Sequence, residues 1–451
     1  MKVKTITIFL AGIIICQFGW AQDTETWKLE ECIDYAMENN LDIQESALQV
    51  NSSRVNLRED NFQRYPSLNA GGQYINRWGR SIDPTTNQFT TERISSNGLS
   101  FRSSMPIFQG FQINNTIKQS QANLQSDRYA LEDMQNNIKL DIVSAYMDVI
   151  FNQALVENAE SQVKTTQAQY ELTEKQVVAG ALPIANQYEV ASQLASDQVN
   201  LVTARNDYQL ALLILKQLLQ IPASEAFSVK EPDIEVEDYN ISEYTVSQVY
   251  ETAEQNQPVV KSAELNQESA TYGVKVAKGG YYPSLTINAD IFTNYSDIAI
   301  DRTNPLSDYS FWEQYDDNLS QSVSLNLNIP IFNNLNARSN VQRAKIQKDR
   351  SRIVYERTLN QLRQTIERAY NDAMAASETY QSAQLQVKAL EETFRAIEKR
   401  YNAGAVNYVD LQLASNNLFQ ARTQLLRAKY DFIFRIKVLD FYLGNPITFE
   451  N

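Results

Sequence analysis

The most extended pattern in the chain is a repeat of apolar positions in two segments, 111–179 and 335–403, neither of which contains proline or glycine. Apolar side chains in the second segment recur at alternating steps of four and three residues: Tyr355, Leu359, Leu362, Ile366, Ala369, Ala373, Ala376, Tyr380, Ala383, Val387, Leu390, Phe394, Ile397 and Tyr401. This spacing is typical of a coiled-coil seam, and each segment would form a helix on the order of 100 Å long at 1.5 Å per residue. Gly180 and Gly404 follow the segments and predict turns into return helices. We therefore expect two long helical hairpins, about 111–221 and 335–443.

Elsewhere the period changes to two residues, which is typical of strands with one apolar and one polar face. The pattern predicts two strand hairpins, about 67–106 and 284–330, and therefore four strands per chain. The apolar positions are clearest in the second hairpin: Leu285, Ile287, Ile291, Val323, Leu325 and Leu327. In the first hairpin Leu99, Phe101 and Met105 alternate with polar residues. A soluble sandwich with one buried face is the alternative interpretation.

Aromatic residues gather near the predicted strand ends, as they do where strands leave the hydrocarbon layer of a membrane. They are Tyr65, Tyr74, Trp78, Tyr281, Tyr282 and Phe292. If the apolar face meets lipid, the six apolar residues of the second hairpin are the predicted lipid contacts.

The two halves of the chain share landmarks at equal spacing, which indicates an internal duplication. Pro66 and Pro283 each lie 27 residues after an Asn in an Ala-x-x-Asn motif, and Gly180 and Gly404 each lie 74 residues after a second proline. We therefore divide the chain into a first repeat at 22–222, a connector at 223–244, a second repeat at 245–445 and a tail at 446–451. The spacing between the two prolines of each repeat differs, 40 residues against 47, which predicts an exposed loop there.

The N-terminus has the pattern of a secretory signal peptide, with Lys2 and Lys4 before a short apolar run and a small residue, Ala21, at the expected cleavage site. Residues 1–21 are the predicted signal peptide, and lipid attachment at Cys16 is the less favoured alternative. Cleavage leaves Cys32 as the single thiol, which we expect in a core with Leu29, Ile33 and Ala36. No later segment approaches the roughly 18 apolar residues of a spanning helix, so a membrane crossing requires strands.

The chain contains no histidine, which excludes catalysis by Ser-His-Asp or Cys-His and the commonest zinc ligand sets. Its net charge of −14 disfavours nucleic acid as a partner. We expect no metal, no cofactor and no enzymatic activity. A cell-wall hydrolase with paired carboxylates is an alternative, although no acidic pair has a cleft-forming pattern.

Four strands cannot close a barrel, and an open sheet edge in lipid leaves backbone groups unpaired at several kcal/mol each. Closure therefore requires several chains. A dimer would supply eight strands and a trimer twelve, and an eight-stranded barrel is filled by side chains. A conducting pore favours the trimer or a larger assembly.

These landmarks together resemble the TolC-like outer-membrane efflux family over about residues 28–445. The resemblance implies an α+β membrane protein in which duplicated coiled-coil hairpins and four β-strands per chain build a trimeric 12-stranded β-barrel and an α-helical periplasmic tunnel. It implies an outer-membrane exit duct of a Gram-negative cell that serves a tripartite efflux or type I secretion system. A homotrimer, a periplasmic adaptor, an inner-membrane pump and outer-membrane lipid would be its partners. The alternative is a periplasmic coiled-coil scaffold without a pore.

The resemblance also assigns site residues. The adaptor-facing residues would be the two hairpin tips: Val178, Ala179, Gly180, Ala181, Leu182, Ala403, Gly404, Ala405 and Val406. Asp410 falls where the family often has an aspartate lining the narrow end, although a carboxylate interacting with the helix dipole is the structural alternative. Asn186 stands at the equivalent position of the first repeat, and Glu189 is a second candidate acid. Tyr401 matches an aromatic residue that holds the closed tip, but it also occupies a seam position, which favours core packing.

Overall fold

A computed structural model describes residues 26–82, 87–232, 241, 244–301 and 308–447. The first half of the chain contains these elements: β1 Thr26–Trp27, α1 Leu29–Asn39, α2 Leu41–Phe62, β2 Ser67–Arg77, β3 Ser81–Ile82, β4 Phe89–Thr90, β5 Ile94–Gln109, α3 Gln112–Val178, α4 Ile184–Leu218 and β6 Ser228–Val229. The second half contains α5 Val246–Asn256, α6 Pro258–Gly279, β7 Ser284–Ser296, α7 Phe311–Asp317, β8 Ser320–Asn328, α8 Asn336–Asn402 and α9 Tyr408–Leu443. The predicted signal peptide, with Cys16, lies outside these residues.

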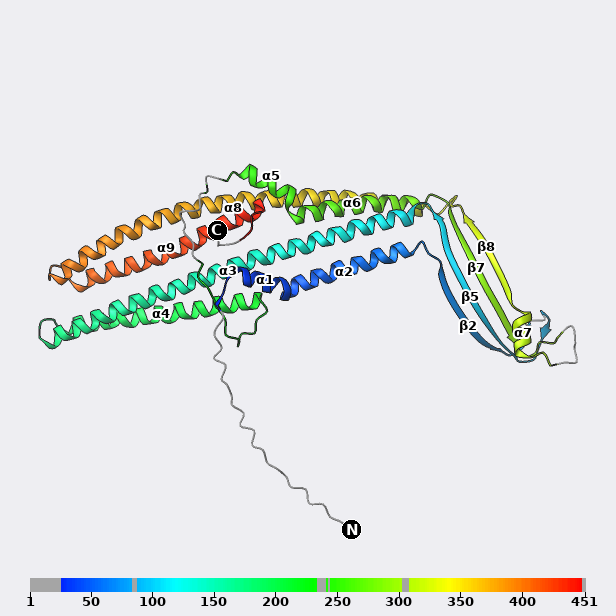
Figure 1. Ribbon diagram of the computed structural model, residues 1–451, viewed down its shortest axis with the longest axis horizontal. Coiled ribbons are helices and arrows are strands. Elements are labelled where there is room, and N and C mark those ends of the chain that lie inside the picture. Colours follow the sequence, from blue (N-terminus) through cyan, green and yellow to red (C-terminus); the bar gives the residue numbers. More distant parts are fainter. Residues whose placement is uncertain (1–25, 83–86, 233–240, 242–243, 302–307, 448–451) are drawn as a thin grey trace, which may run out of the picture.

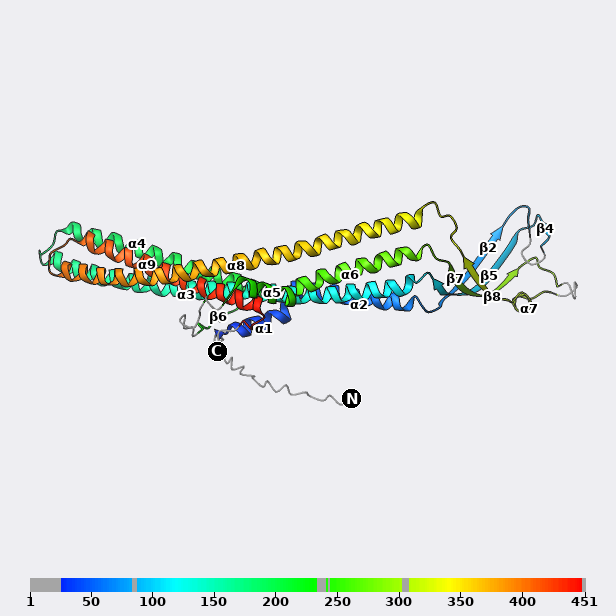
Figure 2. The same cartoon turned by 90° about the horizontal axis from the view of Figure 1, so that it is seen from above.

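The molecule is elongated, with a β-sheet at one end and the two helical tips at the other (Figure 1). α3 and α8 each have 67 residues and run from the sheet to the tips, as their uninterrupted sequences predict. At about 1.5 Å per residue each helix is about 100 Å long. In the half of the molecule near the tips, α3 packs on α4 and α8 packs on α9. In the half near the sheet, α2 packs on α3, and α6 packs on both α3 and α8. The two tip hairpins run side by side in Figure 1 and overlap when seen from above (Figure 2), and α3 contacts α9 between them.

The sheet has four antiparallel strands in the order β2-β5-β7-β8, so the two strand hairpins are joined through β5 and β7. A register shift between Pro106 and Phe108 bends β5 where it approaches the helices. Two smaller sheets complete the topology, a parallel β1–β6 pair and an antiparallel β3–β4 pair.

The main core lies halfway along the molecule, where α1, α3, α4 and the β1–β6 pair meet. Cys32 is fully buried there with Leu29 and Ala36, and Ile33 packs against the same cluster, as predicted. Burial raises the pKa of the Cys32 thiol to about 12, with Glu31 and Glu30 adding to the effect, so the thiol stays neutral at physiological pH. Tyr146 donates to the carbonyl of Trp27 at 3.2 Å and tethers α3 to the β1–β6 pair.

Two local features, one in α9 and one between β7 and β8, depart from the repeating patterns. In α9 the apolar residues recur at steps of four and three residues except at Arg435, and Ile436 is buried there instead, beside Phe432 and Leu439. Arg435 instead lies at the edge and pairs with Asp372 at 3.0 Å on α8. The segment between β7 and β8 also contains a short helix, α7, that the period-two pattern does not predict. Within the described ranges, no helix is both long and apolar enough to cross a membrane.

Candidate functional site: the helical tips and the two faces of the sheet

Each helical hairpin ends in a glycine with left-handed backbone conformation, Gly180 at φ +72° and Gly404 at φ +71°. The next residue closes the turn, because Ala181 N donates to Gln176 O at 2.8 Å and Ala405 N donates to Arg400 O at 2.9 Å. A Cβ built on Gly180 or Gly404 would meet no atom within 4 Å. The positive φ, and not crowding, therefore explains glycine at both tips.

The tips present an exposed surface made of small and apolar residues. Val178 is 85% exposed, and most of the other residues at the two tips are exposed as well. The exposed members are Ala179, Gly180, Ala181, Ala403, Gly404 and Ala405, and the half-buried members are Leu182 and Val406.

Behind the tips, aromatic residues pack the two hairpins of one chain together. Tyr408 and Leu411 of α9 form a buried cluster with Val190 of α4, and the ring of Tyr401 lies 6.2 Å from that of Tyr408. Gln169 on α3 donates to the Tyr401 hydroxyl at 3.3 Å. Tyr401 thus combines the predicted packing with a hydrogen bond to the other hairpin.

Of the predicted acidic residues, Asp410 lies in the first turn of α9, whereas Glu189 lies in the second turn of α4. Asp410 is exposed on α9, and its backbone N–H donates to the side chain of the N-cap residue Asn407 at 2.9 Å. This position favours the helix-dipole interpretation, since a carboxylate is stabilised near a helix N-terminus. Glu189 is exposed and Asn186 half-buried in the matching part of α4.

A polar network joins the hairpins about three helical turns above the tips. Asp197 of α4 is only 3% exposed and accepts from Thr166 at 2.6 Å and Gln193 at 2.8 Å. Gln193 also donates to Asn416 of α9 at 3.2 Å and accepts a hydrogen bond from Gln412. The described contacts therefore connect α3, α4 and α9 through polar side chains.

The sequence interpretation missed this network. Apolar residues of α3 recur at the same steps of four and three as those of α8, through Ile142, Ala145, Val149, Val156, Ala159 and Val163. Continuing this register would have found the network, because it places Thr166 and Thr173 at buried seam positions. Polar residues at a seam cost stability but select one pairing of helices.

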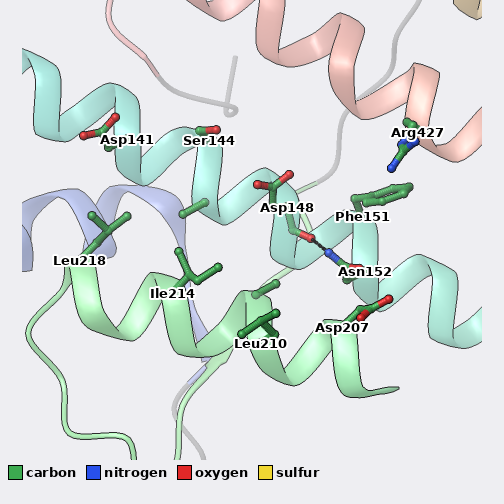
Figure 3. A pocket seen from close by; sticks show the side chains of 12 residues that line it. Asp141, Ser144, Asp148, Phe151, Asn152, Asp207, Leu210, Ile214, Leu218 and Arg427 are labelled. Atoms are coloured by element: carbon green, nitrogen blue, oxygen red, sulfur yellow. Dashed lines mark hydrogen bonds between the residues drawn. The ribbon is translucent and has the colours of Figure 1, made fainter. Parts of the chain in front are cut away.

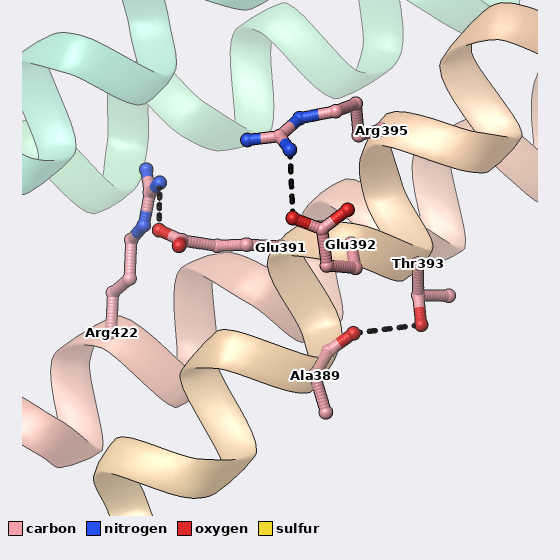
Figure 4. A network of polar contacts seen from close by, with 6 residues as sticks. All are labelled: Ala389, Glu391, Glu392, Thr393, Arg395 and Arg422. Atoms are coloured by element: carbon pink, nitrogen blue, oxygen red, sulfur yellow. Dashed lines mark hydrogen bonds and ion pairs between the residues drawn. The ribbon is translucent and has the colours of Figure 1, made fainter.

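Charged pairs lie on the outside of the second hairpin (Figure 4). Arg422 of α9 pairs with Glu391 of α8 at 2.6 Å, and Arg395 pairs with Glu392 at 2.7 Å on the same helix. Such exposed pairs contribute about 0–1 kcal/mol each. The buried seam, and not these pairs, holds the second hairpin together.

The register of the sheet sorts its side chains onto two chemically different faces. Leu285 lies opposite Leu327 and Ile287 opposite Leu325, while Met105 lies beside Ile287 on the other side. These residues share the apolar face with Ala289, Ile291, Val323 and Phe101. Val323 is 75% exposed, and the sheet has no covering layer over this face in the described chain except at its far end.

The opposite face is polar and carries a charge pair. Arg102 lies 3.4 Å from Asp290, and Ser104 donates to Asn288 at 2.8 Å. Phe292 lies on this polar face by register, opposite Ser100, so it is not among the aromatic residues of the apolar face.

A groove of about 540 Å³ lies halfway along the tunnel helices, between α3 and α4 (Figure 3). Its floor is apolar, with Phe151, Leu210 and Ile214, and Asp148 and Arg427 stand at its rim. Burial raises the pKa of Asp148, and the guanidinium of Arg427 partly offsets this effect.

Among the described residues, no group of three or more His, Cys, Asp or Glu is placed to hold a metal ion.

Comparisons with known proteins give the family. The family model described as outer membrane efflux protein matches residues 32–219 and again 249–445. The cation efflux system protein CusC of Escherichia coli K12 is 23% identical over 429 residues, covering 91% of this chain and 85% of CusC. Outer membrane protein TolC of Salmonella enteritidis is 21% identical over 448 residues, covering 98% of this chain and 87% of TolC.

Solved structures have the same fold. A crystal structure of CusC superposes with a TM-score of 0.77 at 19% identity, covering 95% of this chain and 94% of CusC. The outer membrane protein VceC from Vibrio cholerae superposes with a TM-score of 0.76 at 16% identity, covering 93% of this chain and 97% of VceC. With two matched repeats that together span most of its length, the chain belongs to the outer membrane efflux protein family and is a TolC-like protein of the outer membrane.

Proposed function

We propose that three copies of this chain close a 12-stranded β-barrel in the outer membrane and continue as a helical tunnel through the periplasm. The observation that carries the proposal is the four-stranded sheet, which has one apolar face, one polar face and two terminal strands, β2 and β8. Joining β8 of one copy to β2 of the next satisfies both edges, since unpaired backbone groups in lipid cost several kcal/mol each.

The faces of the sheet fix its orientation in this barrel. Leu285, Ile287, Ile291, Val323, Leu325 and Leu327 contact lipid, and Arg102 and Asp290 line the lumen. Twelve strands are favoured over eight because an eight-stranded barrel is filled by side chains and leaves no aqueous path. Because Arg102 and Asp290 carry opposite charges, this pair adds no net charge to the lumen of the proposed barrel.

The duct conducts passively and is not an enzyme. It forms the outer component of a tripartite efflux or type I secretion system, in which an inner-membrane pump supplies the energy. The relatives CusC, named for cation efflux, and TtgC of Pseudomonas putida, a probable efflux pump protein, support efflux of ions or small molecules.

A periplasmic adaptor docks on the two tips, Val178 to Leu182 and Ala403 to Val406. Their exposed apolar surface lies at the end of the molecule farthest from the sheet, which supports this assignment. Val178→Asp should abolish export while leaving assembly and bilayer conductance unchanged, because Val178 is exposed and makes little contribution to packing. Loss of assembly would contradict a docking role.

Asp410 lines the narrow end of the tunnel, with Asn186 in the equivalent turn of α4 and Glu189 one turn farther along. A threefold ring of carboxylates attracts cations and repels anions. Asp410→Ala should raise the single-channel conductance or reduce its cation preference in planar bilayers. If the conductance and the cation preference are unchanged, Asp410 does not line the lumen, and its role is the interaction with the helix dipole.

Export phenotypes in a deletion strain test the function directly. The proposal expects the strain to become sensitive to particular small molecules or ions, or to retain one secreted protein. A scaffold without a pore would produce no ion conductance from the purified protein in bilayers.

A further inference from the structure

At the end of the sheet away from the helical tunnel, α7 covers part of the apolar face. Thr293 of β7 donates its hydroxyl to the carbonyl of Tyr315 at 2.7 Å, and the Tyr315 hydroxyl donates to Asn97 of β5 at 2.6 Å. Thr293 lies two residues after Ile291, and Asn97 two residues before Leu99, so both belong to the apolar face. α7 therefore stands on the side of the sheet that the proposed barrel turns toward lipid.

The helix is fixed to the sheet and not merely adjacent to it. Gln314 is buried and accepts from the backbone N–H of Ser296 at 3.0 Å, while its amide donates to the carbonyl of Tyr309 at 3.0 Å. Ser310 and Glu313 form a capping box at the first turn. These contacts hold the short helix in one orientation although seven residues are too few for an isolated helix to be stable.

The orientation leaves aromatic rings exposed. Phe311 stacks on Tyr315 with ring centroids 4.3 Å apart, and Phe311 also contacts Tyr295 of β7 at 5.1 Å. Trp312 lies beside Phe311 and is 76% exposed. At 3.6 residues per turn the aromatic residues lie within about 100° of one another, Asp317 lies on the opposite side, and Asp316, four residues after Trp312, borders the aromatic side.

The distance along the sheet places this aromatic cluster at a membrane boundary. From Leu285 to Tyr295 the strand advances ten residues, which rise about 26 Å at about 3.4 Å per residue and a tilt of about 40°. The apolar band of an outer-membrane barrel is about 25 Å tall. A second aromatic group, Phe111 with Tyr282, lies at the other end of the same strands.

We propose that α7 is an interfacial anchor that inserts Phe311 and Trp312 among the lipids of the outer leaflet. The inference rests on the proposed barrel, because lipid must cover the apolar face of the sheet for α7 to meet it. Continuity with that face argues for lipid as the occupant. α7 stands over β5 and β7, the two inner strands, and so lies away from the edges at which neighbouring copies would join.

Tryptophan quenching in phosphatidylcholine vesicles tests the proposal. The full-length protein, Trp312→Phe and the double variant Trp312→Phe/Leu325→Trp are reconstituted in lipid brominated either near the headgroup or deep in the acyl chain. The fluorescence component that disappears in Trp312→Phe should lose most of its intensity with shallow bromines, and acrylamide in water should quench it weakly. The component added by Leu325→Trp, which pairs with Ile287 near the opposite boundary of the apolar face, should be quenched by brominated lipid and only weakly by acrylamide.

Three results overturn the assignment. If acrylamide quenches the Trp312 component strongly and brominated lipid does not, α7 projects into water. If neither quenches it, protein covers Trp312. If the Leu325→Trp component is also insensitive to brominated lipid, the proposed barrel fails together with the anchor, whereas quenching of Leu325→Trp alone leaves the barrel intact and removes only the anchor.

Discussion

The hydrogen bonds of Gln193 predict how strongly the two hairpins of a chain hold the tunnel closed. Gln193 on α4 donates to Asn416 at 3.2 Å and accepts from Gln412, both on α9. Gln193→Ala removes both of these hydrogen bonds to α9. At about 1 kcal/mol net for each hydrogen bond, the loss is about 2 kcal/mol. If the tunnel opens by separation of the hairpins, this change shifts the ratio of open to closed channels about 30-fold, since 1.36 kcal/mol corresponds to a factor of ten.

The matched control is Gln167→Ala, since Gln167 bonds only within its own helix, donating to Glu171 at 2.9 Å. Single-channel recordings in planar bilayers give the open probability, and sensitivity of cells to an antibiotic too large for general porins reports leakage. Gln193→Ala should increase both, and Gln167→Ala should leave both near the wild-type level. Equal effects of the two substitutions, or no effect of Gln193→Ala, would refute a closing role for these contacts.

Three further predictions address the sheet, the junction of strand and helix, and the tip. Val323→Arg should destabilise the assembled barrel by about 2–4 kcal/mol, because Val323 pairs with Ala289 near the middle of the lipid face, whereas Ser324→Arg on the adjacent lumen face should not; heat dissociation of the oligomer in detergent compares the two. Gly110→Ala should lower the free energy of unfolding by about 2–5 kcal/mol, since the φ of Gly110 is +57° and a Cβ there would clash with neighbouring backbone. Gly180→Ala should lower it by only about 1–2 kcal/mol, because the positive φ is the only obstacle at that position. Thermal melts followed by circular dichroism measure the difference. Burial raises the pKa of Tyr408 from its ordinary value of 10 to about 12, so the stability that the neutral phenol contributes is complete below pH 10 and falls as the pH rises to 12. Tyr408→Phe should remove this part of the loss of stability at alkaline pH. If the melting temperature of Tyr408→Phe depends on pH as that of the wild type does, Tyr408 is not the titrating group.

The long helices and the strand faces were predictable because their signals are local and repeated. α3 and α8 contain no proline or glycine, and their ends coincide with Gly180 and Gly404, whose positive φ only glycine adopts without strain. The alternation that predicts a shared face for Ile287 and Leu325 is a backbone property, since successive strand residues point to opposite sides.

Other features depend on contacts that no single segment encodes. The buried Asp197 looks like an ordinary polar residue until α3 and α4 pack, and only then does it meet Thr166. α7 is too short to show a helical period, although the capping pair Ser310 and Glu313 marks its beginning. In the proposed barrel, closure of the sheet depends on neighbouring copies, because a single chain presents β2 and β8 as its terminal strands.

The claim on which the account depends is that several copies must complete one barrel. Native mass spectrometry of protein extracted from outer membranes in detergent measures the number of chains directly. The account predicts a mass of three chains that persists until the detergent is removed or the sample is heated. A single chain that remains folded and soluble in buffer without detergent would contradict it.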